Sequence, residues 1–325
     1  MPTLVYSQPL FDLFSFARRG PGQRDHLSPE EIRQLARTVR RTPEVMVKIL
    51  PKSANTLSAV QKHLAYIGRK GDLDLETDDG ERLRGGNDLV EDWDLELDEY
   101  RRKSDLTSTR EREPARLVHK VIFSMPAGTP PEKVLTAVKK FAREEFALKH
   151  RYVMALHTDT PSPHVHMVIK AVSEQGQRLL IRKATLREWR SEFARHLRAL
   201  GVAANATPLY IRGETNLRKP DGIYRASLRG ESIHMRERAE TVVQELAKGK
   251  LRTEPGKERL VATRNKVQRA WWAVGDILIR NGHQELAART RRFAGEMLPP
   301  RTENEYIAAE LMREPRARRR SPTTR

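Results

Sequence analysis

The chain of 325 residues contains no cysteine, which excludes disulfides and cysteine-based metal sites and fits a reducing compartment. It also lacks an apolar run long enough to span a membrane. Residues 1–19 are mildly apolar, but Pro9 and Asp12 interrupt them and no basic segment precedes them, so they match a signal peptide poorly. We therefore expect a cytoplasmic protein without a membrane span.

Positive charge, by contrast, is abundant. The chain has 61 lysines and arginines against 43 acidic residues, a net charge of +18. Such an excess predicts a polyanionic partner, and nucleic acid fits better than a membrane surface. Residues 72–99 reverse the balance, with thirteen acidic side chains against two arginines. We expect this segment to form a hairpin and an acidic helix or loop on a solvated face that nucleic acid avoids.

Strand-like and helix-like patterns alternate through the middle of the chain. Strand patterns occur at 44–50, 116–125, 151–157, 164–172 and, more briefly, 178–181, and helical patterns at 56–68, 130–148 and 185–200. Antiparallel-capable strands interleaved with helices predict an α+β fold, a two-layer domain whose antiparallel sheet carries a histidine hairpin.

The remaining segments give the expected domain organisation. The sequence beyond residue 214 is mostly helical, basic and polar, and its apolar stretch 270–279 predicts a small core of its own. We expect four parts: a basic N-terminal arm (1–42), the α+β domain (43–214), a helical basic extension (215–311) and a disordered arginine-rich tail (312–325).

Three histidines and an aspartate are concentrated in the segment HTDTPSPHVH, at His157, Asp159, His164 and His166. Strand alternation puts His164 and His166 on one face, about 6–7 Å apart at Cα, and a hairpin would bring His157 across from them. Three converging imidazoles are typical of a catalytic metal site with open positions. The competing interpretation is a set of hydrogen-bonded histidines on a half-buried face.

Tyr66 differs from the other six tyrosines in its position. It ends an amphipathic helical pattern directly before the turn Gly68-Arg69-Lys70-Gly71, so its phenol would face solvent beside two cations suited to phosphate. His63 lies one helical turn earlier, within reach of it. From these residues alone, a structural role at the edge of the helix remains the competing interpretation.

Three segments, in this order and spacing, resemble the motifs of a known family. They are HLAYIGRKGDLDLE (63–76), FSMPAGT (123–129) and HTDTPSPHVHMVI (157–169). They are similar to the motifs of relaxases, the HUH-type, tyrosine-dependent and metal-assisted DNA nickases of conjugative and mobilizable plasmids. The resemblance is closest to the MOBP class, which includes the border endonuclease of T-DNA transfer, and it covers roughly residues 43–215.

The resemblance implies roles for the residues of these motifs. Tyr66 would be the nucleophile, and Asp159 would orient a histidine or help to accept the tyrosine proton. The divalent ion, Mg²⁺ or Mn²⁺ by analogy, would be held by His157, His164 and His166, although nitrogen ligands also suit Zn²⁺ or Ni²⁺. DNA contacts are expected from Ser124, Thr129, Arg69 and Lys70. The family usually has Asn where this chain has Lys170, which alternation places on the histidine face and which could contact phosphate instead.

The implied function is site- and strand-specific nicking of DNA at an origin of transfer, with a 5′-phosphotyrosine adduct and a free 3′-OH as products. Single-stranded or extruded DNA would be the substrate, and relaxosome accessory proteins and a type IV secretion coupling protein would be partners. Two alternatives stay open: a metal-dependent nuclease that uses activated water, and a non-catalytic DNA-binding module of replication or an accessory complex.

The C-terminal arginines suggest a separate hypothesis. Related relaxases travel with their DNA through a type IV secretion channel, and basic tails resemble the signals used. The tail arginines are Arg313, Arg316, Arg318, Arg319 and Arg320. A tail that adds DNA affinity is the alternative.

Overall fold

The computed structural model describes residues 25–50, 55–84, 88–105, 116–214 and 229–312, together with Leu13 and Gly86. The expected tail beyond Met312 and most of the expected N-terminal arm lie outside these residues. Contacts group the described residues into two compact units, one from residue 40 to 206 and one that joins 25–39 to 207–312. None of the described helices combines the length and apolar character that a membrane span needs.

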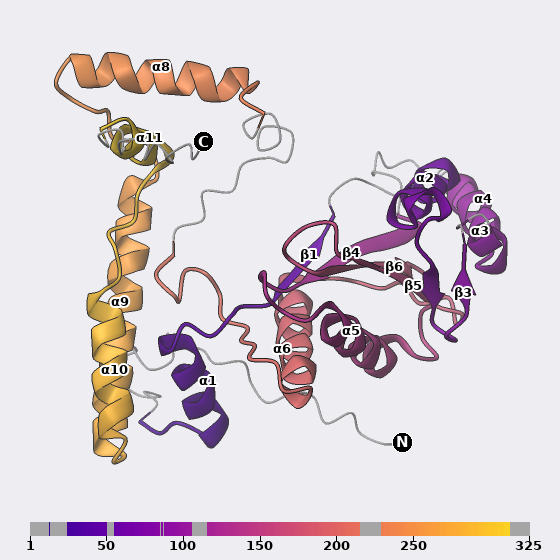
Figure 1. Cartoon of the computed structure of the whole chain (residues 1–325), viewed down its shortest axis with the longest axis horizontal. Coiled ribbons are helices and arrows are strands. Elements are labelled where there is room, and N and C mark those ends of the chain that lie inside the picture. The colour runs from indigo at the N-terminus through magenta and orange to yellow at the C-terminus, as the bar shows by residue number, and fades with distance from the viewer. Residues whose placement is uncertain are drawn as a thin grey trace, which may run out of the picture. The chain divides into compact units, whose positions relative to one another are not determined.

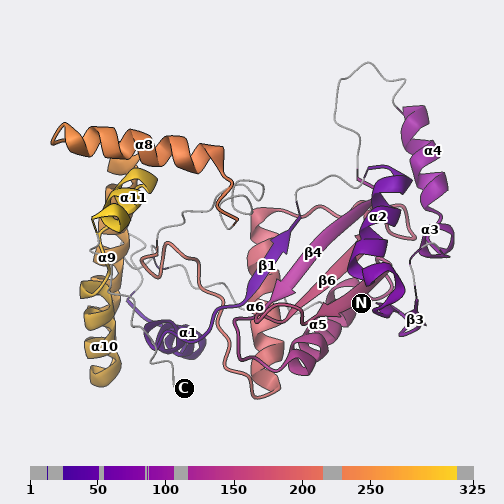
Figure 2. The same ribbon diagram turned by 45° about the horizontal axis from the view of Figure 1, so that its top comes forward.

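The first unit is built around a six-stranded antiparallel sheet (Figures 1 and 2). The strand order is β1-β4-β6-β5-β2-β3. The strands are β1 Met46–Ile49, β2 Leu75–Thr77, β3 Arg82–Leu83, β4 Val118–Ser124, β5 Tyr152–His157 and β6 His164–Lys170. The sheet confirms the expected α+β class and its antiparallel histidine hairpin, which β5 and β6 form in the interior of the sheet.

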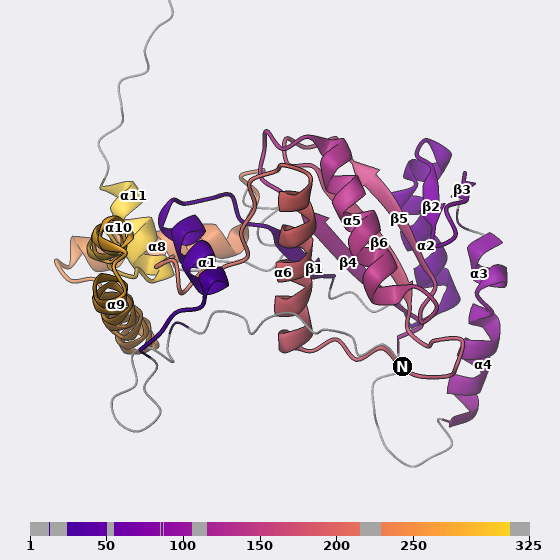
Figure 3. The same ribbon diagram turned by 90° about the horizontal axis from the view of Figure 1, so that it is seen from below.

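Two helices cover one face of the sheet, as Figure 3 shows. Helix α5 (Pro131–Phe146) starts with proline in its first turn, where a missing N–H costs nothing, and α6 (Lys183–Ala199) follows the hairpin. Phe141 of α5 and Phe193 of α6 pack against Phe123 of β4, as part of a core that the two helices form with alternate strand residues. The remaining strand side chains, which alternate with these, point to the other face of the sheet.

The other face is covered at the β5 end of the sheet. Helices α2 (Leu57–Ile67), α3 (Asp88–Asp92) and α4 (Leu95–Asp105) contribute to a second core with Val153, Ala155 and Val168. These three strand residues share their face with His157 and His166, by alternation. Helix α2 therefore packs beside the histidines, and the acidic segment forms β2, β3, α3 and α4, in line with the predicted hairpin and acidic helix.

The second unit is helical. Its helices are α1 Pro29–Val39, α8 Ile233–Ala247, α9 Lys257–Arg280, α10 Gln284–Gly295 and α11 Glu303–Leu311. Helices α9 and α10 pack against each other around Trp271 and Phe293, so the 270–279 stretch supplies the predicted core. Helix α1 packs on α10 and has Ser28 and Glu31 as a reciprocal cap. The four-part division stays a prediction, and here residues 25–39 join the C-terminal helices.

The expected short strand at 178–181 is wrong. The structure has only an isolated bridge there, between Val172 and Arg178. Leu179 and Ile181 nevertheless pack against the α5–α6 core, which explains why the segment is apolar. An apolar run can cover a core as a loop, and four residues are too few to distinguish the two cases.

Candidate active site

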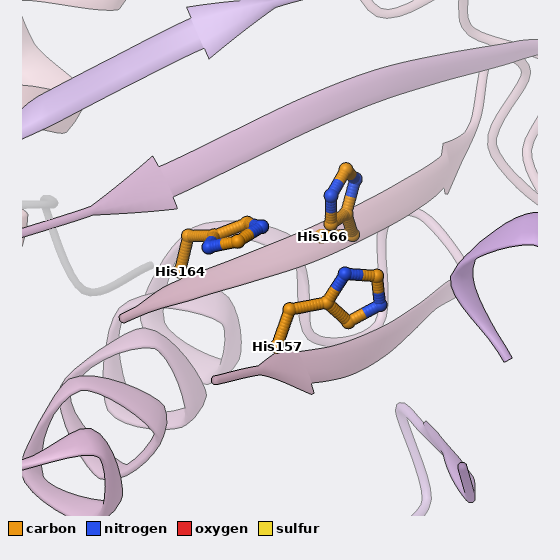
Figure 4. A group of neighbouring side chains, drawn as sticks. All are labelled: His157, His164 and His166. Carbon is orange, nitrogen blue, oxygen red and sulfur yellow. The ribbon is translucent and has the colours of Figure 1, made fainter. Parts of the chain in front are cut away.

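The histidine hairpin brings three imidazoles together on one face of the sheet (Figure 4). His157 ends β5 directly opposite His164 at the start of β6, and His166 lies opposite Ala155. The ring centroids of His157 and His166 are 4.5 Å apart, and His164 lies 5.3 Å from each. One nitrogen from each ring lies within 4.8 Å of the others. The expected convergence of the three side chains is thus present.

Burial keeps two of these rings neutral. Desolvation, followed by the neighbouring His157 and His164, lowers the pKa of His166 to about 3, and desolvation is also the largest cause that lowers the pKa of His157. A neutral imidazole offers a lone pair to a metal ion, whereas a protonated one repels it. Near pH 7 these two rings are therefore available as ligands.

Hydrogen bonds fix which nitrogen carries the lone pair. Nε2 of His157 donates to the carbonyl of Ile67 at 2.7 Å, which leaves Nδ1 as the acceptor. Nδ1 of His164 donates to the carbonyl of Ser162 at 3.0 Å, which leaves Nε2 free for a ligand. Such contacts on the far nitrogen orient metal-binding histidines.

The three residues fit a divalent ion. Nδ1 of His166 is buried and has no hydrogen-bond partner among the described residues, which is costly unless another group contacts it. Metal–nitrogen bonds of about 2.0–2.1 Å bring three ligand atoms closer together than 4.8 Å, a difference that small side-chain rotations close. A three-histidine set also leaves coordination positions open for a substrate.

Tyr66 stands beside this cluster. It is the penultimate residue of α2, whose first turn is capped by the Thr56 hydroxyl and whose Val60, Leu64 and Ile67 face the core. The Tyr66 ring is half exposed, 5.9 Å from the His166 ring and 6.4 Å from the His157 ring. The amphipathic helix thus presents a phenol to solvent and to the histidines together.

His63 fills the next turn of the same helix face. Its ring stacks on Tyr66 at 6.1 Å and meets the edge of His166 at 6.2 Å. Desolvation, with a smaller effect of the nearby Lys120 ammonium, lowers the pKa of His63 to about 4. His63 is therefore a neutral packing partner of the phenol, in the position that one helical turn of spacing suggested.

The turn after Tyr66 connects the helix to the histidines. Arg69 and Lys70 open the short 3₁₀ turn η2 (Arg69–Gly71), both with positive φ. The Arg69 guanidinium lies over the Tyr66 ring with Cζ 5.4 Å from its centroid, contacts Nδ1 of His157 at 3.2 Å and forms an ion pair with Asp159. Lys70 is exposed. Asp159 is linked to His157 through Arg69, and its roles in orienting a histidine or accepting the tyrosine proton stay predictions.

The second motif supports the histidine loop. Ser124 is buried directly opposite His164, and its hydroxyl donates to the carbonyl of Pro163. Thr129 donates to the carbonyl of Pro126 at 2.9 Å within the turn before α5. Both hydroxyls are thus engaged in holding local backbone, and their direct DNA contacts stay a prediction.

Lys170 is not brought to the cluster. Alternation places it on the histidine face as expected, but at the far end of β6, where it is 5 % exposed. Its ammonium lies 3.5 Å from the carboxylate of Glu174. A phosphate contact from this position stays a prediction that the geometry does not support.

Strand β1 adds two residues that the sequence reasoning missed. Met46 lies opposite Ser124 and Lys48 opposite Ile122, so both share the histidine face, and both are exposed. Their alternation with Val45 and Val47 is visible in the sequence. That these two side chains lie on the histidine face follows only from the pairing of β1 with β4, which no local sequence pattern reveals.

Comparison with known proteins relates this site to a known family. Residues 66–201 match the family model described as relaxase, MobA/VirD2-like, nuclease domain. Residues 66–201 therefore resemble a relaxase nuclease domain of this type. The matched stretch begins at Tyr66 and includes the histidine hairpin.

Individual relatives are similar in sequence to this chain over part of their length. The T-DNA border endonuclease VirD2 of Rhizobium radiobacter is 27% identical over 140 residues, 39% of this chain and 31% of the relative. The VirD2 of Agrobacterium fabrum is 26% identical over the same length, 30% of its chain. The chain therefore spans about a third of the length of these relatives.

Two solved structures are similar at a lower level. One is the MobM relaxase domain bound to plasmid pMV158 oriT DNA, an Mn-bound crystal structure, at 14% identity and a TM-score of 0.38, covering 57% of this chain and 98% of that one. The other comes from work on vancomycin resistance transfer in Staphylococcus aureus, at 14% identity and a TM-score of 0.29, covering 51% and 98%.

Proposed function

We propose that this chain nicks one strand of DNA at a specific site within an origin of transfer, using Tyr66 as the nucleophile. The observation that carries the proposal is the half-exposed Tyr66 phenol 5.9 Å, ring to ring, from the buried His166 of a three-histidine cluster. The relaxase family match and the VirD2 relatives support the same reaction class.

The reaction exchanges one phosphoester for another. The Tyr66 oxygen attacks the scissile phosphorus, the bond from phosphorus to the 3′ oxygen breaks, and that oxygen takes a proton to become a free 3′-OH. The phenolic proton passes to water. A phenol with a pKa near 10 is a better leaving group than an alkyl alcohol, so the 5′-phosphotyrosine link retains the ability to reseal DNA.

His157, His164 and His166 would hold the divalent ion, with Mg²⁺ or Mn²⁺ as our expectation. The ion supplies Lewis-acid stabilisation of the negative charge that develops on the phosphoryl oxygens. Three neutral ligands leave its full charge available for that purpose, whereas carboxylate ligands would cancel part of it. The low pKa of His166 supports this role because the ring stays neutral at the pH of the reaction.

The DNA strand would approach along the exposed part of the histidine face. Lys48 on β1 and Lys70 in the turn after α2 are exposed cations on two sides of the cluster, and they fit a phosphate backbone. We propose single-stranded or extruded DNA as the substrate, with relaxosome accessory proteins and a type IV secretion coupling protein as partners. In this scheme residues 43–214 carry out the nicking in a bacterial cytoplasmic protein. The basic tail 312–325 is either a transfer signal or a segment that adds DNA affinity.

A covalent-adduct assay tests the proposal. Protein and labelled single-stranded oligonucleotides that carry candidate nick regions are incubated with Mg²⁺ or Mn²⁺ and separated on a denaturing gel. We expect a metal-dependent band of protein-plus-DNA mass in the wild type and in Tyr100→Phe, which alters another exposed tyrosine. Tyr66→Phe should abolish it. Cleavage that survives in Tyr66→Phe would overturn the tyrosine mechanism and indicate water as the nucleophile.

A further inference from the structure

One guanidinium contacts the nucleophile candidate, a metal-ligand candidate and the acidic residue of the site. Arg69 pairs with the Asp159 carboxylate, approaches Nδ1 of His157 to 3.2 Å and lies over the Tyr66 ring. Its side chain is about one-third exposed, so these contacts form at the rim of the site rather than in open solvent. A planar guanidinium with several donors can make all three contacts at once, whereas an ammonium is a point charge.

The backbone around Arg69 is shaped for this reach. Arg69 and Lys70 have φ values of 50° and 58°, in the left-handed region that side-chain-bearing residues rarely occupy. Such a conformation persists only where surrounding contacts over-determine it, and it is concentrated at functional sites. The contacts that Arg69 makes with β5 and the following loop are of that kind, and Gly71 completes the turn with φ 104°.

The imidazole of His157, at the end of β5, is contacted on both of its nitrogens. Nε2 of His157 bonds the carbonyl of Ile67 at 2.7 Å, and Nδ1 faces Arg69. Ile67 is the residue after Tyr66, and Arg69 follows two residues later. The position of the phenol over the histidines therefore depends on these two contacts, one from the backbone and one from a side chain.

We propose that Arg69 is a positioning residue of the nicking reaction, which fixes the Tyr66 turn to the end of β5, and that Asp159 acts through Arg69. This inference rests on the proposed function. It assigns Arg69 a role other than that of a phosphate-binding cation, the role expected from the sequence. Binding of a divalent ion to Nδ1 of His157 would replace one of the three contacts and leave those with Asp159 and the Tyr66 ring.

The test separates positioning from DNA binding in the full-length protein. Single-turnover adduct formation at saturating oligonucleotide gives the rate, and fluorescence anisotropy gives the DNA affinity. Arg69→Ala should lower the rate by about 100-fold, as expected when reacting groups shift by about 1 Å, with a DNA Kd within about threefold of wild type. Arg69→Lys keeps the charge but lacks the fork, so it should not restore the rate.

Two further variants calibrate the result. Lys70→Ala shows what loss of a phosphate contact looks like, with weaker DNA affinity and a salt slope reduced by about 1. Lys140→Ala, on the exposed side of α5, should leave both rate and affinity unchanged. If Arg69→Ala behaves like Lys70→Ala, with weak binding and a normal rate at saturation, the positioning role is wrong.

A double-mutant cycle tests the link to Asp159. Asp159→Asn should lower the rate, and combining it with Arg69→Ala should lower the rate no further than Arg69→Ala alone, because residues that act through one contact are not additive. Fully additive losses would show that Asp159 acts independently and would overturn that half of the proposal.

Hydrogen exchange separates this inference from the proposed function. Amides of residues 66–71 should exchange at least about tenfold faster in Arg69→Ala than in wild type or Lys140→Ala, if the guanidinium holds the turn. If the wild type forms no adduct but Arg69→Ala still shows this faster exchange, the proposed reaction is overturned and the contact network stands. Unchanged exchange together with an unchanged rate would overturn the positioning role.

Discussion

The Tyr66 ring meets the His166 ring at 5.9 Å with an interplanar angle of 83°. The two residues come from different elements, since Tyr66 is near the end of α2 and His166 lies inside β6. Packing of α2 on the histidine face brings them together. The half-exposed Tyr66 phenol thus lies next to the buried, neutral His166 imidazole, at a place where a phosphodiester could contact both.

The polarity of the product is the first prediction. Attack by Tyr66 on phosphorus with release of the 3′ oxygen leaves protein on the 5′ end of the downstream fragment. An oligonucleotide labelled 3′ of the nick should therefore shift to protein-plus-DNA mass, and one labelled 5′ of it should not. The upstream fragment should be extendable by a DNA polymerase. A shift of the 5′ label instead would mean that the opposite bond breaks.

Removal of one imidazole should remove the metal. We expect His166→Ala to weaken Mn²⁺ binding at least about 100-fold in calorimetric titration, because loss of a ligand costs more than loss of its supporting contact. His119→Gln serves as the matched control, since His119 is also largely buried on β4 but points to the other face, where it contacts the Leu179 carbonyl. Equal Mn²⁺ affinity in the two variants would contradict the three-histidine site.

Stability should fall in mild acid. Burial lowers the pKa of His119 and of His63 to about 4, below the value near 6.5 expected in the unfolded chain. The unfolded state therefore binds more protons between about pH 4 and 6.5, so the free energy of unfolding decreases as the pH falls, by up to about 1.4 kcal/mol per pH unit for each histidine.

Urea unfolding of the metal-free protein at several pH values checks this expectation. His119→Gln removes one titrating group, so its stability should fall less steeply between pH 6.5 and 4, by about one proton. A variant that follows the wild-type slope would show that His119 binds its proton equally in the folded and unfolded states.

Lys48 provides a prediction about the path of the DNA. Its ammonium is exposed on the histidine face, so Lys48→Ala should weaken oligonucleotide binding by about three- to tenfold and reduce the salt slope by about 1. The thermal midpoint should not change, because the side chain is not part of the core. Lys140→Ala again serves as the control, and equal DNA affinities of the two variants would exclude a backbone contact at Lys48.

Local patterns sufficed for the hairpin and for the elements around it. Alternation predicted that His164 and His166 share a face, and a hairpin register brought in His157. Helical spacing and the following glycines located α2 and put Tyr66 at its end. Each of these inferences depends on neighbours within about ten residues, where chain geometry is restrictive.

Long-range arrangements were beyond those patterns. The strand order puts β1 next to β4, and this pairing alone gives Lys48 its place beside the cluster. Alternation assigned Lys170 to the correct face but could not show that Glu174 and the packing around it bury the ammonium. The Arg69–Asp159 pair requires a left-handed turn at two residues whose types disfavour it.

The histidine side and the Tyr66 side of the site should differ in how easily they open, because the histidine hairpin lies in the interior of the sheet. Strand β6 is hydrogen-bonded to β4 on one side and to β5 on the other, so exposing His166 requires breaking two ladders at once. Opening of this kind costs nearly the whole stability of a domain, whereas the end of a helix frays at little cost. The ligand side of the site is therefore rigid over long times, and any rearrangement that admits or releases DNA belongs to the Tyr66 side.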